Sequence, residues 1–394
     1  PEFRVVFATF AVTVASLTVK MLALSALVYA RTGSPLLSAV AFLAGFLPQA
    51  VGALTLMSLA DRLPPRAALA WWRAVQAVVL GVLALGVLPV WAALLLVVVS
   101  GLGDAVTGAI SSALLVDVLA EVPGGYVLGR SVLNIAVGGM QILGYAAGGA
   151  LIATTGTGGA FAIAAAVSLI AAVLTRTGLR RRAPRATGRA SAAATWHGNR
   201  RLFRDRGLRL LLLAQWLPNG LIVGAEAMFV PYAGNAAGLL FTAAACGMLA
   251  GDLVVGRWVP PGVRARLALP LYALLAVPYL GFLLRPGPQL AAVLVAVASL
   301  GYSATLAVQE QFLAALPEEL VGQGLGVAQS GMLTAQALAA TVIGTVAEVS
   351  APATAIVAAA VASLGATLAT CRSQTSRAAG AAPSRSPTPP STSA

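Results

Sequence analysis

The stretch that decides the fold class is residues 5–30, VVFATFAVTVASLTVKMLALSALVYA, in which Lys20 is the only charged side chain. A helix needs roughly 20 apolar residues to cross the hydrocarbon core of a bilayer, so this run is long enough to span it. Similar apolar runs recur along the rest of the chain. Further spans are expected at 36–60, 67–88, 90–119, 127–153, 158–178, 208–232, 236–258, 266–285, 288–316, 321–348 and 352–371. The predicted fold is an all-α membrane protein with twelve transmembrane helices.

The composition agrees with a chain whose main solvent is lipid. Of its 394 residues, 59% are hydrophobic and 9% are charged, whereas a soluble protein has roughly 25% charged residues. The two cysteines, Cys246 and Cys371, and the single histidine, His197, give no spacing typical of a disulfide framework or a metal site. No Walker loop and no Gly-x-Ser-x-Gly elbow occurs. We therefore expect a protein without cofactor or metal that is not an enzyme.

The basic residues indicate the orientation of the chain. A formal net charge of +13 would suggest nucleic acid in a soluble protein. With the N-terminus in the cytoplasm, however, 22 of the 25 basic residues fall in cytoplasmic segments, and the outer loops hold only Arg31 and Arg285. Such asymmetry is typical of inner-membrane proteins. We expect a multi-pass protein of the inner (plasma) membrane, with both termini cytoplasmic and no nucleic-acid partner.

The chain divides at an arginine-rich segment. We expect an N-terminal six-helix bundle at 1–178, a cytoplasmic linker at 179–207 that touches anionic lipid headgroups, a C-terminal six-helix bundle at 208–371 and a disordered cytoplasmic tail at 372–394. Two loop patterns repeat between the halves: 61–66 recurs at 256–261, and 119–123 recurs at 313–317. A repeat at one offset predicts parallel bundles related by an axis along the membrane normal.

The loop between the second and third spans carries a family resemblance. The sequence Ala60-Asp61-Arg62-Leu63-Pro64-Pro65-Arg66 resembles the Gly-x-x-x-Asp-Arg-x-Gly-Arg-Arg motif of the major facilitator superfamily. Asp61, Arg62 and Arg66 match it, whereas Met57 and Pro64 stand at its glycine positions. The resemblance implies two rocking bundles and an ionic latch in this loop. Asp252 and Arg257 are expected to be the equivalent latch in the second half.

The fifth span carries a second signature, Gly144-Tyr145-Ala146-Ala147-Gly148-Gly149. It resembles the Gly-Pro-x-x-Gly-Gly motif of drug/proton antiporters, with Tyr145 in place of the proline. The alternative reading is ordinary small-residue helix packing. The segment from Leu119 to Asn134 resembles the subgroup that contains enterobactin-type siderophore exporters and macrolide efflux proteins. These likenesses imply efflux and multidrug resistance.

Charged residues inside the spans are candidates for function, because charge in the bilayer core is costly. Lys20 and Asp104 lie at similar depth, and we expect an ion pair that either couples to protons or is purely structural. Glu226 has no obvious basic partner, so it can carry a proton or bind a cationic substrate; the alternative is an exposed position at the outer rim.

Uncharged polar residues predict the substrate cavity. Gln215, Asn219 and Glu226 share one face of the seventh span. Asn134, Gln141 and Gln336 are further candidates, which either bind substrate or join helices. The tryptophans near span ends, Trp71, Trp72, Trp91 and Trp258, are expected in the interfacial belts.

Three functions compete. The leading interpretation is a monomeric secondary transporter that uses protons to export an amphipathic small molecule, such as a drug, natural product or siderophore. The second is a proton-coupled importer of a small metabolite. The third is a membrane scaffold or sensor that transports nothing.

Overall fold

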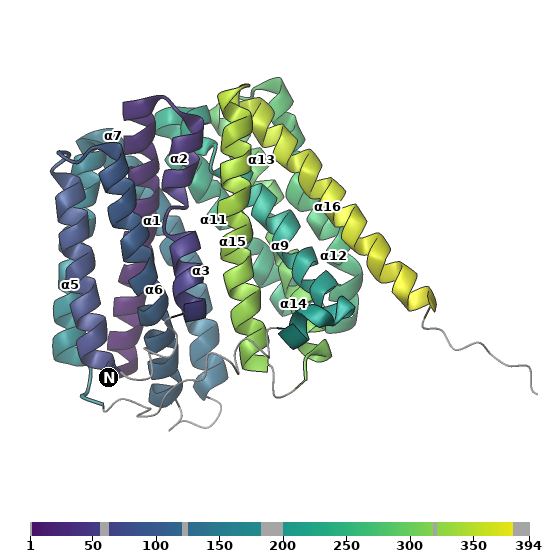
Figure 1. Cartoon of the computed structure of the whole chain (residues 1–394), viewed down its shortest axis with the longest axis horizontal. Coiled ribbons are helices and arrows are strands. Elements are labelled where there is room, and N and C mark those ends of the chain that lie inside the picture. The colour runs from purple at the N-terminus through teal and green to yellow at the C-terminus, as the bar shows by residue number, and fades with distance from the viewer. Residues whose placement is uncertain (1, 56–62, 120–124, 183–199, 318–320, 381–394) are drawn as a thin grey trace, which may run out of the picture.

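The computed structural model describes residues 2–55, 63–119, 125–182, 200–317 and 321–380, and every regular element in these ranges is a helix (Figure 1). Ten helical runs are long and apolar enough to cross a membrane. Two of them, Gly138–Gly178 and Arg206–Trp258, are each interrupted midway and so contain two passes. The described chain therefore crosses twelve times, as the sequence predicts.

The first six passes form one bundle, on the left in Figure 1. They are α1 (Glu2–Thr32), α2 (Pro35–Phe42) with α3 (Phe46–Thr55), α5 (Pro65–Ala84), α6 (Val90–Leu119) and both arms of α7 (Gly125–Gly178). The arms of α7 meet at Gly156, whose φ of 72° and ψ of 177° are open to glycine and strained for other residues. This glycine replaces a loop between the fifth and sixth spans.

The last six passes form the second bundle, on the right in Figure 1. They are α9 (Arg206–Glu226) with α10 (Phe229–Ala233) and η1 (Gly234–Ala236), α11 (Ala237–Trp258), α12 (Pro261–Ala276) with η2 (Val277–Leu284), α13 (Pro288–Ser299) with η3 (Leu300–Ser303) and α14 (Ala304–Ala315), α15 (Val321–Glu348), and α16 (Pro352–Gly380). Asp205 caps α9 by accepting hydrogen bonds from the Gly207 and Leu208 amides.

Four spans are broken where the sequence predicts continuous helices, and in the seventh the break falls between Glu226 of α9 and Phe229 of α10. The second span bends between α2 and α3, and the ninth and tenth change to 3₁₀ geometry at η2 and η3. Pro278 opens η2, where its missing N–H cannot continue the α-helical ladder. At the end of the chain, α16 continues to Gly380, so the predicted disordered tail is helical over 372–380. Most of the predicted linker, 183–199, lies outside the described residues.

The bundles meet along two seams. Helices α2 and α3 pack on α15, and α7 packs on α11. Buried residues of the first bundle, including Met21, Ala39 and Phe42, belong to the same hydrophobic cluster as the core of the second. Both the N-terminus and the described end of α16 lie at the lower end in Figure 1. We call this the amino-terminal face and the other end the opposite face.

Candidate functional site

A cavity of about 220 Å³ lies between the two bundles. The first bundle contributes α1, α2, α3 and α7, and the second contributes α9, α11, η3 and α15. The lining is aromatic, aliphatic and amide-bearing, with one carboxylate: Met21, Phe42, Leu43, Phe46, Gln141, Tyr145, Asn219, Val223, Glu226, Phe241, Ala244, Ala245, Met248, Tyr302, Leu333 and Gln336. A mostly apolar cavity with a few convergent polar groups is the usual form of a small-molecule site.

Glu226 is the charged residue of this cavity. It is the last residue of α9, is half-buried, and accepts hydrogen bonds at Oε1 from Tyr302 Oη at 3.0 Å and Tyr279 Oη at 3.3 Å. The structure therefore places it inside the protein and not at an exposed rim. Neither tyrosine stood out in the sequence, because both lie on distant 3₁₀ segments of the ninth and tenth spans.

The predicted polar stripe on α9 is divided in the structure. Asn219 lines the cavity and accepts a 2.8 Å hydrogen bond from Gln336 Nε2 of α15. Gln141 also lines it, and its buried Oε1 receives no hydrogen bond from the described residues. Gln215 is buried outside the cavity lining, with an unpartnered Nε2, because α9 turns it toward the bundle interior. Asn134 belongs to a stretch of α7 whose side chains the structure does not describe.

An aromatic stack joins the bundles on one side of the cavity. Phe241 of α11 lies 4.7 Å from Phe42 of α2 and 5.0 Å from Tyr145 of α7, measured between ring centroids. Phe229 of α10 meets the same ring edge-on at 5.0 Å. Tyr145, the residue that departs from the fifth-span motif, thus lines the cavity and bridges the halves. The tyrosine at the proline position of the motif was the sequence feature that could have indicated this contact.

The opposite face carries a contact between the halves. Glu348 at the end of α15 accepts hydrogen bonds from the Ser34 hydroxyl and, at 3.2 Å, from the Leu36 amide. Ser34 is also the N-cap of α2, accepting from the Leu37 amide. A carboxylate at a helix N-terminus is stabilised by the unpaired amides and the helix dipole. Glu348 therefore fastens the second bundle to the first beyond the aromatic stack.

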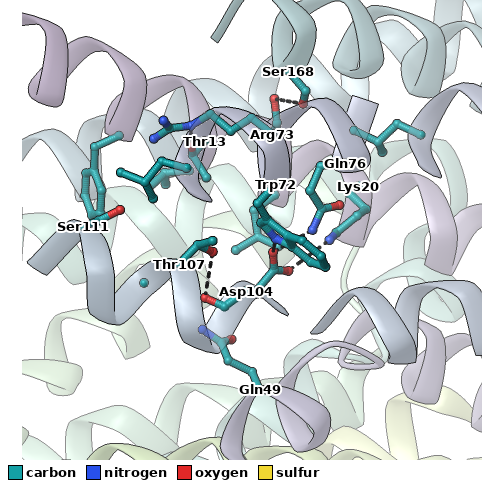
Figure 2. A pocket seen from close by; sticks show the side chains of 17 residues that line it. Thr13, Lys20, Gln49, Trp72, Arg73, Gln76, Asp104, Thr107, Ser111 and Ser168 are labelled. Atoms are coloured by element: carbon teal, nitrogen blue, oxygen red, sulfur yellow. Dashed lines mark hydrogen bonds and ion pairs between the residues drawn. The ribbon is translucent and has the colours of Figure 1, made fainter. Parts of the chain in front are cut away.

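The Lys20–Asp104 pair lies in a second cavity, of about 270 Å³, inside the first bundle. Lys20 Nζ is 3.5 Å from Asp104 Oδ2. Asp104 Oδ1 also accepts from Trp72 Nε1 at 2.8 Å and Gln76 Nε2 at 2.6 Å, as Figure 2 shows. The expected belt position of Trp72 is wrong, because its indole N–H serves the buried carboxylate. Trp71, Trp91 and Trp258 are highly exposed on the protein surface.

Arg73 lies in the same cavity with its guanidinium turned away from Asp104 (Figure 2). It is 9% exposed and donates to the hydroxyls of Thr13, at 3.3 Å, and Thr175. The sequence placed this arginine among the cytoplasmic charges, but α5 carries it two turns into the bundle. A narrow pocket lined by Lys20 and Asp104 also includes Met21, Phe42 and Phe46 of the central cavity. The ion pair thus adjoins both cavities.

The glycines of the fifth-span motif face two neighbours. A Cβ at Gly144 would lie 1.8 Å from Thr18 Oγ1 of α1, and one at Gly148 would touch Val19 at 3.4 Å. A Cβ at Gly149 would lie 2.9 Å from the Gly238 Cα of α11, in the other bundle. The motif therefore sets close packing both within the first bundle and across the seam.

The latch residues are only partly described. Asp61 and Arg62 lie outside the described residues, and Arg66 is half-buried at the start of α5. No described basic group lies within 4.0 Å of Asp252, so the expected pairing with the exposed Arg257 is absent here. Instead, Arg264 pairs with Glu310 of α14 and donates to the Val255, Gly256 and Val259 carbonyls at the end of α11. This connects the loop after α11 to α14.

Comparison with known proteins agrees with this geometry. Residues 6–235 match the family model described as Major Facilitator Superfamily. The fold resembles a POT family transporter in complex with a thioalcohol-conjugated peptide (TM-score 0.74, 11% identity, 95% of this chain and 96% of that one). It also resembles the nucleoside transporter NupG (0.70, 14%, 94% and 99%) and a D-xylose-proton symporter (0.66, 15%, 93% and 96%). No curated protein matches by sequence.

Twelve spans in two bundles with a cavity between them are the architecture of a secondary membrane transporter, and the family match supports that class. The chain belongs to the major facilitator superfamily.

Proposed function

We propose that this transporter exports an amphipathic small organic molecule from the cytoplasm in exchange for protons, as the drug-antiporter and siderophore-exporter likeness implies. The observation that carries the proposal is Glu226, which is the one charged side chain among the described residues that line the cavity between the bundles. A carboxyl group there can hold either a proton or a substrate contact as the bundles rock. The apolar lining around it suits an amphipathic ligand.

The fifth span supports the direction of transport. Its last glycine, Gly149, lies at the seam where it approaches Gly238, and this is where an antiporter signature would act if it controls how the bundles rock. The Lys20–Asp104 pair is a second proposed coupling element, because it adjoins the central cavity through the narrow pocket. Asp61, Arg62 and Arg66, with Asp252 and Arg257, remain proposed latch residues at the amino-terminal face.

We further propose a monomer in the plasma membrane with both termini and the arginine-rich linker in the cytoplasm. The bundles are proposed to be 1–178 and 208–371. The charge distribution between the loops supports this topology. A fluorescent protein fused after residue 394 is expected to fluoresce, because the usual green fluorescent protein matures on the cytoplasmic side. A dark but full-length fusion contradicts the assigned orientation.

Transport in inverted inner-membrane vesicles tests the function. An exporter accumulates amphipathic compounds in the vesicle lumen when the lumen is acidified, and collapse of the pH gradient releases them. Glu226→Gln is expected to abolish accumulation, while vesicles without the protein give the background. Proton-driven accumulation in right-side-out vesicles instead identifies an importer. Absence of flux for every compound, from a folded protein, favours the scaffold reading.

A further inference from the structure

We propose that the central cavity binds a protonated amine that keeps at least one N–H, carried on a compact apolar body, and that it discriminates against the matching quaternary ammonium. This rests on the proposed function, because it names the substrate class of the same site. The argument uses the charge, the unpaired acceptors and the aromatic faces of the cavity.

The charge of the lining selects a cation. Among the described residues that line the cavity, Glu226 carries the only formal charge, and none is lysine, arginine or histidine. Lys20 lies in the neighbouring pocket and pairs with Asp104. An ionised Glu226 therefore has no described basic partner. A carboxylate in an apolar cavity interacts strongly with an opposite charge because solvent screening is weak.

The unpaired hydrogen-bond acceptors of the cavity favour a cation that carries N–H donors. Both tyrosine hydroxyls bind Glu226 Oε1, and no described group donates to Oε2. Gln141 Oε1 is buried and also receives no hydrogen bond from a described residue. Gln141 Oε1, as a buried acceptor without a donor, carries a free-energy cost, and the Glu226 carboxylate gains a charge-assisted hydrogen bond from an N–H, so a ligand that supplies N–H groups gains more than one that supplies charge alone. A quaternary ammonium has no N–H and leaves both acceptors unpaired.

The remaining lining suits the body of such a ligand. Tyr145, Phe241 and Tyr302 contribute aromatic rings to the lining, and Met21 and Met248 provide polarizable contacts. Aromatic faces attract cations, and thioethers adapt to irregular apolar shapes. Both the tertiary and the quaternary ammonium can make these contacts. The two probes also differ by one methyl group in size and hydration, so the change of preference in Gln141→Leu is the result that reports the acceptor.

A matched ligand pair tests the proposal with purified full-length protein in lipid nanodiscs. The probes are N,N-dimethyl-2-(1-naphthyl)ethylamine, which is protonated at neutral pH, and its N-methyl quaternary salt. Titration calorimetry is expected to give about tenfold tighter binding of the tertiary amine, which is the size of one hydrogen bond to a charged group. Glu226→Gln should weaken its binding at least tenfold. Gln141→Leu should reduce the preference for the tertiary amine over the quaternary salt.

Gln329→Leu is the matched control, because Gln329 is exposed on α15 and does not line the cavity. Thermal unfolding verifies that each variant is folded. If Glu226→Gln does not fold, the change in probe preference in Gln141→Leu tests the proposal by itself. Equal affinities for the two probes, or an unchanged preference in Gln141→Leu, overturn the proposal. Binding is measured without a proton gradient, so the amine can bind as proposed even if the protein does not export it. Export of neutral compounds alone leaves the transport function intact and overturns the amine class.

Discussion

At the residue scale, the Asp104 carboxylate in the first bundle is held by an ion pair with Lys20 and by hydrogen bonds from Trp72 and Gln76. Asp104→Asn leaves Lys20 as a buried charge without its partner. Breaking a buried pair costs about 3–5 kcal/mol, whereas removing both charges costs far less. Asp104→Asn is therefore expected to lower the thermal unfolding midpoint, and Lys20→Gln added to it should restore part of the loss. A double variant no more stable than Asp104→Asn contradicts a structural pair.

Proton-coupled transport separates the structural and coupling roles of the same pair. If the pair couples to protons, the double variant stays uncoupled even though its stability recovers. Substrate efflux and proton movement are measured together in proteoliposomes, with wild type as the reference. If the double variant remains fully coupled, Lys20 and Asp104 are not part of the proton pathway, and Glu226 remains the candidate.

The sequence contained part of this residue-level site. Lys20 and Asp104 could be matched because two opposite charges at one depth of the membrane are expected to pair. Trp72 and Gln76 lie four residues apart on one helix face, a spacing that could have identified them as donors to Asp104. Tyr279 and Tyr302 could not be found this way, because their approach to Glu226 depends on how the ninth and tenth spans bend.

At the scale of elements, the crossing of α7 and α11 rests on two facing glycines. A side chain at Gly238 would meet the Gly149 Cα at 2.7 Å, which is backbone and cannot move aside locally. Gly238→Val is therefore expected to separate the helices and to reduce transport more than tenfold in the vesicle assay. Ala147→Val, at an exposed position of α7, should leave transport near wild type. Equal transport by both variants contradicts a functional crossing.

Helix breaks were the elements hardest to predict from the sequence. Twelve apolar runs and their order are confirmed because length and hydrophobicity suffice to mark a membrane pass. The interruptions at η2 and η3 lie within equally apolar sequence, so hydropathy does not reveal them. They nevertheless carry the tyrosines that bind Glu226. The cavity lining was therefore predicted better on α9, whose residues keep α-helical spacing, than on the 3₁₀ segments.

At the scale of the whole molecule, alternating access requires the contact between Ser34 and Glu348 to open and close. Replacing both with cysteine, in a background with Cys246→Ser and Cys371→Ser, allows a short reducible bifunctional thiosulfonate to join the bundles at the opposite face. Cross-linking is expected to stop transport, and reduction should restore it. The pair Arg31→Cys and Leu88→Cys is the control, because Arg31 contacts the Leu88 carbonyl within the first bundle and a link there leaves rocking free.

Substrate binding distinguishes blocked rocking from a damaged site. The link at Glu348 lies outside the cavity lining, so a cross-linked protein should still bind a ligand while it fails to release it at the opposite face. Unchanged transport after complete cross-linking would show that the bundles need not separate at Glu348. Loss of both binding and transport would mean instead that the link distorts the cavity. Retained binding with reversible loss of transport is the outcome that a two-bundle transporter requires.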